Sequence, residues 1–408
     1  MGLALAALGP APAGAATITL QEALAAASDN LEVSIASRNR DAAHADIAAA
    51  DHAPLPQLSA KLSQIDLQNG IGPGNVLTAK RIDKAVGLDW TWERGDKRAL
   101  RTEAARRAAA AALADLDEVQ AQQLLAAQGA FFDLLAAQGR IEQLAAIEHS
   151  ARQTADAARV RLKAGDVAVQ DAARAAIEAE RAHADGESAQ LELRRAQLVL
   201  AQLTGRESEA PALQAQADWP NAAPPDPTLP LGPLAELRAD VRAAAERLRA
   251  AESALGAATA LRQADVTWGT SLDHYPGTST RQLELRLSMP LAFGYRYEGE
   301  IGRAAAQVDQ ARDALEKARR NAAAELQRLR AETDSAARRD RLYQGEIVPR
   351  SQEVAERAEL AYSKGALPLT DLLDARRTLR AVLLEALSAR TDLAKAWSAW
   401  RLRTASAR

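Results

Sequence analysis

Two carboxylates near the end of the chain are the residues whose type and spacing most suggest chemistry. They are Asp371 and Asp374, within YSKGALPLTDLLDAR, which runs from Tyr362 to Arg376. Residues three apart lie on one face of a helix, so both carboxylates should project from the same side. Such a pair can attract cations, and aspartates in a first turn also stabilise a helix N-terminus. Helix geometry alone leaves both roles open.

The other polar residues do not suggest an enzyme. The chain has no cysteine, which removes thiolate catalysis and zinc–thiolate sites. It shows no glycine-rich phosphate loop, nucleophile motif or paired acid–base cleft. The five histidines are scattered, and the first two would lie roughly 12 Å apart along a helix, too far to share a metal. We therefore predict no enzymatic activity, no cofactor and no metal site. The histidines are His44, His52, His149, His183 and His274.

Charge and hydropathy restrict the partners of the chain. The formal net charge is −3 and the pI is near 6.1, so no basic field attracts nucleic acid. Residues 1–16 carry no charge, and Ala13-Gly14-Ala15 fits a cleavage site, which predicts a signal peptide. The basic start of such a signal is missing, which suggests a truncated start, and an alanine-rich tail is the alternative. No other uncharged apolar run reaches eighteen residues, so no transmembrane helix is predicted.

The glycine break in YSKGALPLTDLLDAR occurs twice. A second break, in RLKAGDVAVQDAAR, places Gly165 two hundred residues before Gly365. A repeat of this length is typical of gene duplication rather than of a short-period solenoid. The same offset relates Asp171 to Asp371, Ala158 to Ala358 and Ile147 to Ile347.

Each half has the same order of predicted elements. The first repeat covers residues 17–204, the second covers 233–408, and a Pro-rich, irregular linker at 205–232 joins them. In the first half we predict a helical opening at 19–53, strands at 57–68 and 80–92, a long helix at 97–162, a tip at 163–168 and a helix at 169–204. In the second we predict a helical opening at 233–262, strands at 263–274 and 281–293, a long helix at 296–362, a tip at 363–368 and a helix at 369–403.

The predicted strands have one apolar and one polar face. RIDKAVGLDWTW keeps its apolar residues on one parity from Ile82 to Trp92, and QLELRLSMPLAF does so from Leu283 to Phe293. Strands of 10–13 residues, when tilted, match the thickness of a bilayer. Two soluble amphipathic hairpins are the alternative. Aromatic residues where strands meet long helices favour a membrane interface. These residues are Trp90, Trp92, Phe293, Tyr295 and Tyr297.

Four strands cannot close a barrel by themselves. An open sheet edge in lipid would leave backbone groups without hydrogen bonds. The membrane interpretation therefore requires an oligomer, and three copies would give an even number of strands, twelve. The rival without a membrane is a soluble coiled-coil scaffold, which explains the long helices but not the alternating strands.

Taken together, these parts resemble the TolC-like outer-membrane efflux proteins over nearly the whole mature chain. The matching stretches include LPQL before the first strand, LAELRADVRAAAERLRAAE, and YQGEIVPRSQEVAERAELAYSKGALPLTDLLDARRTL. WERGDKRALRTEAARRAA and PLAFGYRYEGEIGRAAA look most like the cobalt–zinc–cadmium resistance (CzcC-like) branch.

The resemblance implies a mainly α fold with a small β part. Long coiled-coil hairpins would form a periplasmic α-barrel, and a trimer would form a 12-stranded β-barrel in the outer membrane of a Gram-negative cell. The implied partners are a periplasmic adaptor protein and an inner-membrane RND-type proton-driven pump. The implied function is the exit duct of a tripartite efflux system, carrying heavy-metal cations. Export of drugs or other small molecules by the same duct is the alternative.

The resemblance also assigns roles near the second glycine break. Asp371 and Asp374 match the channel constriction, where a trimer would gather six carboxylates. Tyr362 and Asp171 match positions that tie neighbouring hairpins in the closed tunnel. The family has a basic residue near the second tip where this chain has Leu367, so the resemblance does not carry the closing salt bridge of the family over to this position.

The glycine breaks match the tips of helical hairpins that meet the adaptor. Gly165 and Gly365 would supply the left-handed cap that lets each helix turn back. Val167 and Leu367, which follow the glycines, are apolar for an exposed turn. Contact with the adaptor and packing between neighbouring hairpins explain them equally well.

Overall fold

The computed structural model describes residues 16–70, 73, 75, 82–275, 279–291 and 293–405. The predicted signal peptide, apart from Ala16, and the first residues of the strand predicted at 80–92 lie outside this part. Two compact units are present, and each draws on both halves of the chain. The first unit contains Leu116–Arg238 with described parts of 1–36 and 320–408. The second contains described parts of 37–115 together with Ala239–Arg319.

Side-chain caps start the first two helices of the first half. The Thr19 side chain accepts from the Glu22 N–H and the Glu22 carboxylate accepts from the Thr19 N–H, which forms a capping box. The helical segment predicted at 19–53 is divided into two helices. The second begins after Asn30, whose Oδ1 accepts from the Val33 N–H at 3.1 Å and caps the new helix. The helices are α1 (Leu20–Ala27), α2 (Leu31–Ala50), α3 (Lys97–Ala164) and α4 (Val169–Thr204).

The long helix of the second half is interrupted by a π-helical turn. Residues Tyr343–Ile347 take i→i+5 hydrogen bonds directly before Pro349, which has no N–H to donate. The long helix starts at Glu298, two residues later than predicted, because Tyr297 has a left-handed φ of 62°. The helices are α5 (Leu231–Glu236), α6 (Ala239–Ala260), α7 (Glu298–Leu342), α8 (Val348–Ser363) and α9 (Leu369–Ala405).

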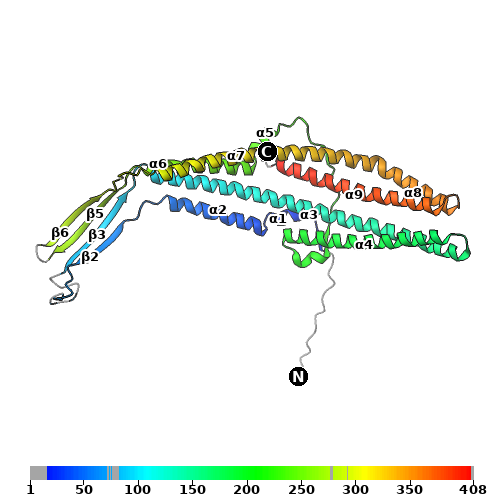
Figure 1. Cartoon of the computed structure of the whole chain (residues 1–408), viewed down its shortest axis with the longest axis horizontal. Helices are drawn as coiled ribbons and strands as arrows, with labels where there is room; N and C mark the ends of the chain where they lie inside the picture. The colour runs from blue at the N-terminus through cyan, green and yellow to red at the C-terminus, as the bar shows by residue number, and fades with distance from the viewer. Residues whose placement is uncertain are drawn as a thin grey trace, which may run out of the picture. The chain divides into compact units, whose positions relative to one another are not determined.

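Four antiparallel strands lie side by side in the second unit (Figure 1). Their order is β2-β3-β5-β6, so β2 and β6 are the sheet edges. Trp90 faces Trp268, which fixes the register between the two central strands. The strands are β2 (Gln57–Ser63), β3 (Asp83–Trp92), β5 (Val266–Tyr275) and β6 (Ser279–Ser288).

Three of these strands are shorter than the predicted segments, for local reasons. β2 stops at Ser63 because Gln64 has a φ of 60° and Asp66 accepts from the N–H of Asn69 at 2.9 Å, which makes a turn. β6 stops two residues before Pro290, which cannot donate to a ladder. β5 starts at Val266 because the Gln263 N–H still bonds to Ala260 at the end of α6.

The linker at 205–232 is more ordered than the sequence predicts. It contains a 3₁₀ helix (Glu207–Ala212), strand β4 (Leu213–Ala215) and the start of α5. β4 pairs in parallel with β1 (Ala16–Ile18), where Thr17 faces Gln214. A three-residue strand is too short to show periodicity, so this pair cannot be predicted from the sequence pattern.

The core of the first unit is built around aromatic side chains. Phe131 and Phe132 are almost fully buried and meet edge to face, with ring centroids 5.7 Å apart. Trp219, from the linker, stacks on Phe132 at 6.2 Å. The Arg390 guanidinium lies 5.6 Å from the centre of the Trp219 ring. This contact attaches the linker to α9.

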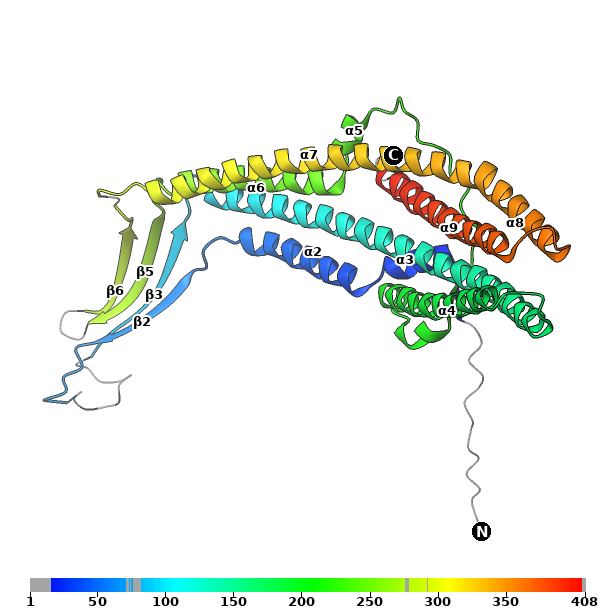
Figure 2. The same ribbon diagram turned by 45° about the vertical axis from the view of Figure 1, so that its right-hand side comes forward.

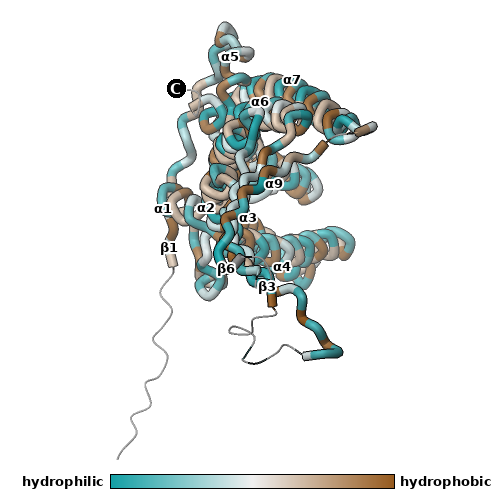
Figure 3. The backbone as a smooth tube through the Cα atoms, turned by 90° about the vertical axis from the view of Figure 1, so that its left-hand side faces the viewer, coloured by the Kyte–Doolittle hydropathy of each residue, from teal (hydrophilic) through white to brown (hydrophobic). Residues whose placement is uncertain are grey.

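Apolar and polar residues alternate along the helices when the chain is coloured by hydropathy (Figure 3). Within the described residues, every helix is too short or too polar to cross a membrane.

Candidate functional site

Both glycine breaks form the same hydrogen-bonded turn. Gly165 has a φ of 82°, and its N–H bonds to the Leu162 carbonyl at 3.0 Å. The next N–H, of Asp166, bonds back to the Arg161 carbonyl at 2.9 Å. These two bonds define a Schellman motif, in which a left-handed residue satisfies the last carbonyls of a helix.

The second turn repeats this arrangement. Gly365 has a φ of 72°, its N–H bonds to the Tyr362 carbonyl at 3.0 Å, and the Ala366 N–H bonds to the Ala361 carbonyl at 2.9 Å. An added Cβ would have no neighbour within 4 Å at either glycine. The positive φ, not crowding, is therefore the reason for glycine at both turns.

The two helical hairpins of the first unit, α3 with α4 and α8 with α9, meet near these turns (Figure 2). The contact is a small apolar cluster. Tyr362 packs against its edge, and the Arg161 guanidinium lies 5.1 Å from the centre of the Tyr362 ring. The buried members are Ala158, Ala175, Leu369, Leu372 and Leu373.

Tyr362 and Asp171 are not bonded to each other within one chain. The Tyr362 hydroxyl is buried and has no hydrogen-bond partner in the described chain. Asp171 lies in the first turn of α4 and forms an ion pair with Arg174 at 3.7 Å. The contact between neighbouring hairpins that the sequence predicts for Tyr362 and Asp171 stays a prediction.

Asp371 and Asp374 lie on the exposed side of α9. The residues between them, Leu372 and Leu373, are buried in the apolar cluster, which directs the carboxylates away from it. Asp371 is in the first turn of α9 and accepts from the Thr370 hydroxyl at 3.3 Å. Across the described parts of the chain, no three His, Asp or Glu side chains are grouped as metal ligands.

Three arginines of α9 reach across to the other helices, and the sequence prediction missed them. Arg376 bonds to Glu359 on α8 at 2.9 Å and to the Ser150 carbonyl on α3 at 3.2 Å. Two further ion pairs reach α4: Arg377 with Glu178, and Arg380 with Asp185. The only signal in the sequence is the spacing of RRTLR, which puts the arginines on neighbouring positions of one helix.

The Arg377–Glu178 ion pair is less exposed on its acidic side. The side chain of Glu178 is 11% exposed and that of Arg377 is 51% exposed. The hydrogen bond from Arg377 lowers the pKa of Glu178, and the same bond raises the pKa of Arg377. A crevice of about 310 Å³ lies beside this pair, and Ile147, Leu373 and Leu383 form part of its wall.

The sheet exposes its apolar face and covers much of its polar face. Trp90 is 61% exposed, whereas Ser271 and Asp273 on the polar face are 8% and 4% exposed. Other apolar side chains with high exposure are Val86, Leu88, Trp92, Trp268, Leu272, Leu283, Leu285 and Leu287. Ile82, which the sequence placed on the same face, is fully buried because it precedes β3. This polarity is the reverse of that in a soluble sheet packed on a core.

Polar cross-strand contacts hold the other face. The hydroxyls of Thr91 and Thr267 are 2.9 Å apart. Arg286 on β6 donates to Asp89 on β3 at 2.8 Å and passes over Gly269 on the strand between them. An added Cβ at Gly269 would lie 2.4 Å from Asp89 Oδ1, so glycine is needed for this ion pair.

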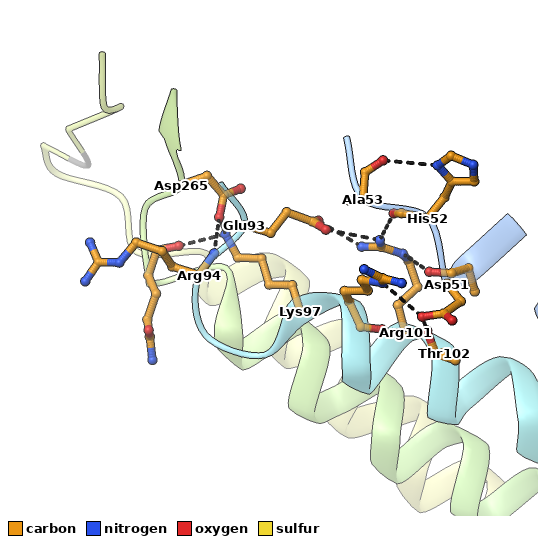
Figure 4. A network of polar contacts seen from close by, with 12 residues as sticks. Asp51, His52, Ala53, Glu93, Arg94, Lys97, Arg101, Thr102 and Asp265 are labelled. Carbon is orange, nitrogen blue, oxygen red and sulfur yellow. Dashed lines mark hydrogen bonds and ion pairs between the residues drawn. The ribbon is translucent and has the colours of Figure 1, made fainter. Parts of the chain in front are cut away.

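A second polar network fixes the strands to the helices (Figure 4). The buried Lys97 ammonium donates to the Gln263 carbonyl and to Asp265, both at 2.7 Å. Arg101 forms two hydrogen bonds with Glu93, at 3.0 and 3.3 Å. Lys97 therefore joins the start of α3 to the chain that enters β5 and so connects the two halves.

Aromatic side chains surround this junction. Trp92 is 61% exposed and Phe293 is 86% exposed. The rings of Tyr295 and Tyr297 lie 5.9 Å apart, and the Tyr295 hydroxyl donates to Glu300. The structure thus places the predicted interface aromatics at the ends of β3 and beyond β6.

Sequence comparison identifies the family. Residues 20–206 and 232–406 match the family described as outer membrane efflux protein. The chain belongs to this family. No curated protein matches the sequence. Membership confirms the general resemblance and places the chain among transport ducts rather than enzymes.

Solved channels share the fold of this efflux protein. The CmeC outer membrane channel of Campylobacter jejuni is similar with a TM-score of 0.81 and 14% identity, over 95% of this chain and 86% of that chain. VceC of Vibrio cholerae is similar with a TM-score of 0.77 and 18% identity, over 95% of each chain. The MtrE channel of Neisseria gonorrhoeae, in its open state, is similar with a TM-score of 0.77 and 20% identity, over 94% of this chain and 88% of that chain. These similarities confirm the predicted fold class of long helical hairpins with a small β part.

Proposed function

We propose that this efflux protein is the outer-membrane exit duct of a tripartite, proton-driven efflux system. The observation that carries the proposal is the reversed polarity of the sheet. A face with Trp90 and Leu285 exposed is stable in lipid and unfavourable in water, at about 25 cal/mol per Å² of apolar surface.

The open edges of the sheet support a homotrimer. The strands β2 and β6 have neighbours on one side only, and unpaired backbone groups are unfavourable in lipid. Pairing β6 of one subunit with β2 of the next removes every edge when three subunits close a ring of twelve strands.

The hairpin turns at Gly165 and Gly365 are the proposed contact with the periplasmic adaptor. Val167 and Leu367 are half-buried in the single chain, so each keeps apolar surface for a partner. The adaptor would connect the duct to an inner-membrane RND-type pump, and the helices would form the periplasmic extension.

Asp371 and Asp374 are the proposed constriction. Both carboxylates are exposed and project from one side of α9, so a three-fold axis would bring six of them together. Leu367 cannot supply a closing salt bridge. The hydrogen bonds and ion pairs of Arg376, Arg377 and Arg380 would instead hold the two hairpins of each subunit together.

Heavy-metal cations are the proposed cargo, on the likeness of WERGDKRALRTEAARRAA and PLAFGYRYEGEIGRAAA to the cobalt–zinc–cadmium branch. Deleting the gene should increase sensitivity to Zn²⁺, Co²⁺ or Cd²⁺ and leave sensitivity to hydrophobic drugs unchanged. The opposite pattern would support a drug duct.

Crosslinking in detergent tests the duct itself. The bands should stop at three subunits, and the purified protein should form channels in planar bilayers. A stable detergent monomer that keeps its strand signal would exclude the shared barrel.

A further inference from the structure

We propose that Arg94, Arg262 and Arg296 form a binding surface for the phosphate of an anionic phospholipid. The three residues lie in the second unit, where the strands give way to the helices. The inference rests on the proposed function, because it requires the apolar face of the sheet to lie in a membrane.

An arginine lies beyond the same end of each central strand. On β3 the exposed residues Trp90 and Trp92 are followed, two positions on, by Arg94. On the β5 side, Arg262 lies in the turn that ends α6, four residues before Val266. Trp92 faces Val266 in the register, so both arginines lie beyond the same end of the strand pair. A guanidinium at this depth reaches the headgroup layer while its carbon chain stays among apolar groups.

Backbone contacts hold the three arginines at one place. The Arg262 side chain donates to the Arg296 carbonyl at 3.4 Å, which joins the end of α6 to the chain that follows β6. The Arg94 N–H donates to Asp265 at 3.0 Å, which joins the end of β3 to the start of β5. These contacts bring the three residues to the same end of the sheet.

The charge of Arg94 is unpaired among the described residues, whereas other cations nearby are paired. Lys97 bonds to Asp265 at 2.7 Å and Arg98 to Asp51 at 2.9 Å. The Arg94 guanidinium forms no hydrogen bond or ion pair with a described residue, and Figure 4 draws it away from the network.

Glu298 is the counter-charge nearest to Arg262 and Arg296. Hydrogen bonds from the backbone N–H groups of Arg296 and of Glu298 itself are the main cause of its lowered pKa. Asp265 is already paired with Lys97, so the three arginines outnumber Glu298, the carboxylate whose charge acts on Arg262 and Arg296.

The neighbouring aromatic residues decide in favour of a lipid over a free anion. Phe293 is 86% exposed and Tyr295 is 50% exposed, immediately before Arg296 in the chain. Exposed rings beside guanidinium groups suit a ligand that combines acyl chains with a phosphodiester. Because the junction lies on the helical side of the sheet, the lipid belongs to the inner leaflet under the proposed function.

Fluorescence quenching on the full-length trimer in vesicles tests the surface. Brominated phosphatidylcholine quenches tryptophans that touch acyl chains, and competing lipids relieve the quenching according to their affinity. Phosphatidylglycerol should compete about tenfold better than unbrominated phosphatidylcholine. The preference should fall between about 50 mM and about 500 mM salt, because exposed charges are screened.

The triple variant R94Q/R262Q/R296Q should reduce the preference to about twofold or less. The control R159Q/R312Q/R357Q removes the same charge from exposed helix positions and should keep the wild-type preference. A wild-type preference that is absent or independent of salt overturns the inference without any variant. Equal losses in both triple variants also overturn it.

The same vesicles separate this inference from the proposed function. Wild-type trimers that conduct but show no preference for phosphatidylglycerol would refute only the lipid surface. A wild-type protein that forms no trimer and no channel would refute the duct.

Discussion

Asp89 and Arg286 form an ion pair of 2.8 Å across an intervening strand, although 197 positions separate them in the sequence. Gly269 lies beneath the pair. Residues of both halves of the chain thus meet on the polar face of one sheet.

Replacing Gly269 by alanine should break this ion pair. The new Cβ would lie 2.4 Å from Asp89 Oδ1 and 3.1 Å from Arg286 Nε, so one side chain must move. We expect a loss of about 1–3 kcal/mol in stability, measured by thermal dissociation of the trimer. Gly302→Ala is the control, because nothing lies within 4 Å of its added Cβ and alanine favours a helix. Equal stability of the two variants would contradict the role given to Gly269.

The Arg377–Glu178 ion pair should make the hairpin contact sensitive to acid. Glu178 has a lowered pKa in the folded chain, so its contribution to stability is present above its unfolded pKa and is lost as the pH falls through the folded value. The protection of α4 and α9 amides against hydrogen exchange, measured relative to the intrinsic exchange rate at each pH, should therefore fall as the pH falls through this range.

Glu178→Gln should show reduced protection of the α4 and α9 amides already at neutral pH. Its protection should then change little as the pH falls. Glu187→Gln, on the exposed surface of the same helix, is the control. An acid response in Glu178→Gln as large as in wild type would assign the effect to other groups.

Removing the carboxylates of the proposed constriction should change conduction. Asp371→Ala with Asp374→Ala should raise the single-channel conductance and weaken cation preference in planar bilayers. The pair Asp309→Ala with Asp313→Ala removes the same charge from exposed positions of α7 and should leave both quantities near wild type. Unchanged conductance and selectivity in the first variant would leave these residues only their role at the helix end.

The hairpin turns allow contact with the adaptor to be separated from the fold. Gly165→Ala with Gly365→Ala should lower the free energy of unfolding by about 1–2 kcal/mol per turn. Each added Cβ has no neighbour within 4 Å, so the only cost is that of a left-handed backbone with a side chain. We expect this variant to form trimers and to support resistance.

Gly165→Arg with Gly365→Arg adds bulk and charge to the same turns. It should also insert and trimerise, yet lose crosslinking to the adaptor and lose resistance. Normal resistance at a normal protein level would show that the turns are not the docking surface.

Features that depend on neighbouring residues could be predicted from the sequence alone. Alternation from Val86 to Trp92 indicated a strand with one apolar face, and α4 has the bounds expected from its composition. Gly165 and Gly365 indicated left-handed turns, because glycine takes a positive φ without a Cβ penalty. Family motifs in the sequence also pointed to the efflux proteins, which the comparison confirmed.

Contacts between distant segments became visible in the folded chain and not before. The Arg377–Glu178 tie, the Arg161 guanidinium over Tyr362, and the pairing of β1 with β4 all join residues from different elements. Helix and strand periodicity is set by residues two to four positions apart, so it predicts elements and faces. Which charged groups meet depends instead on strand register and on how helices pack, and these follow from the burial of the whole chain.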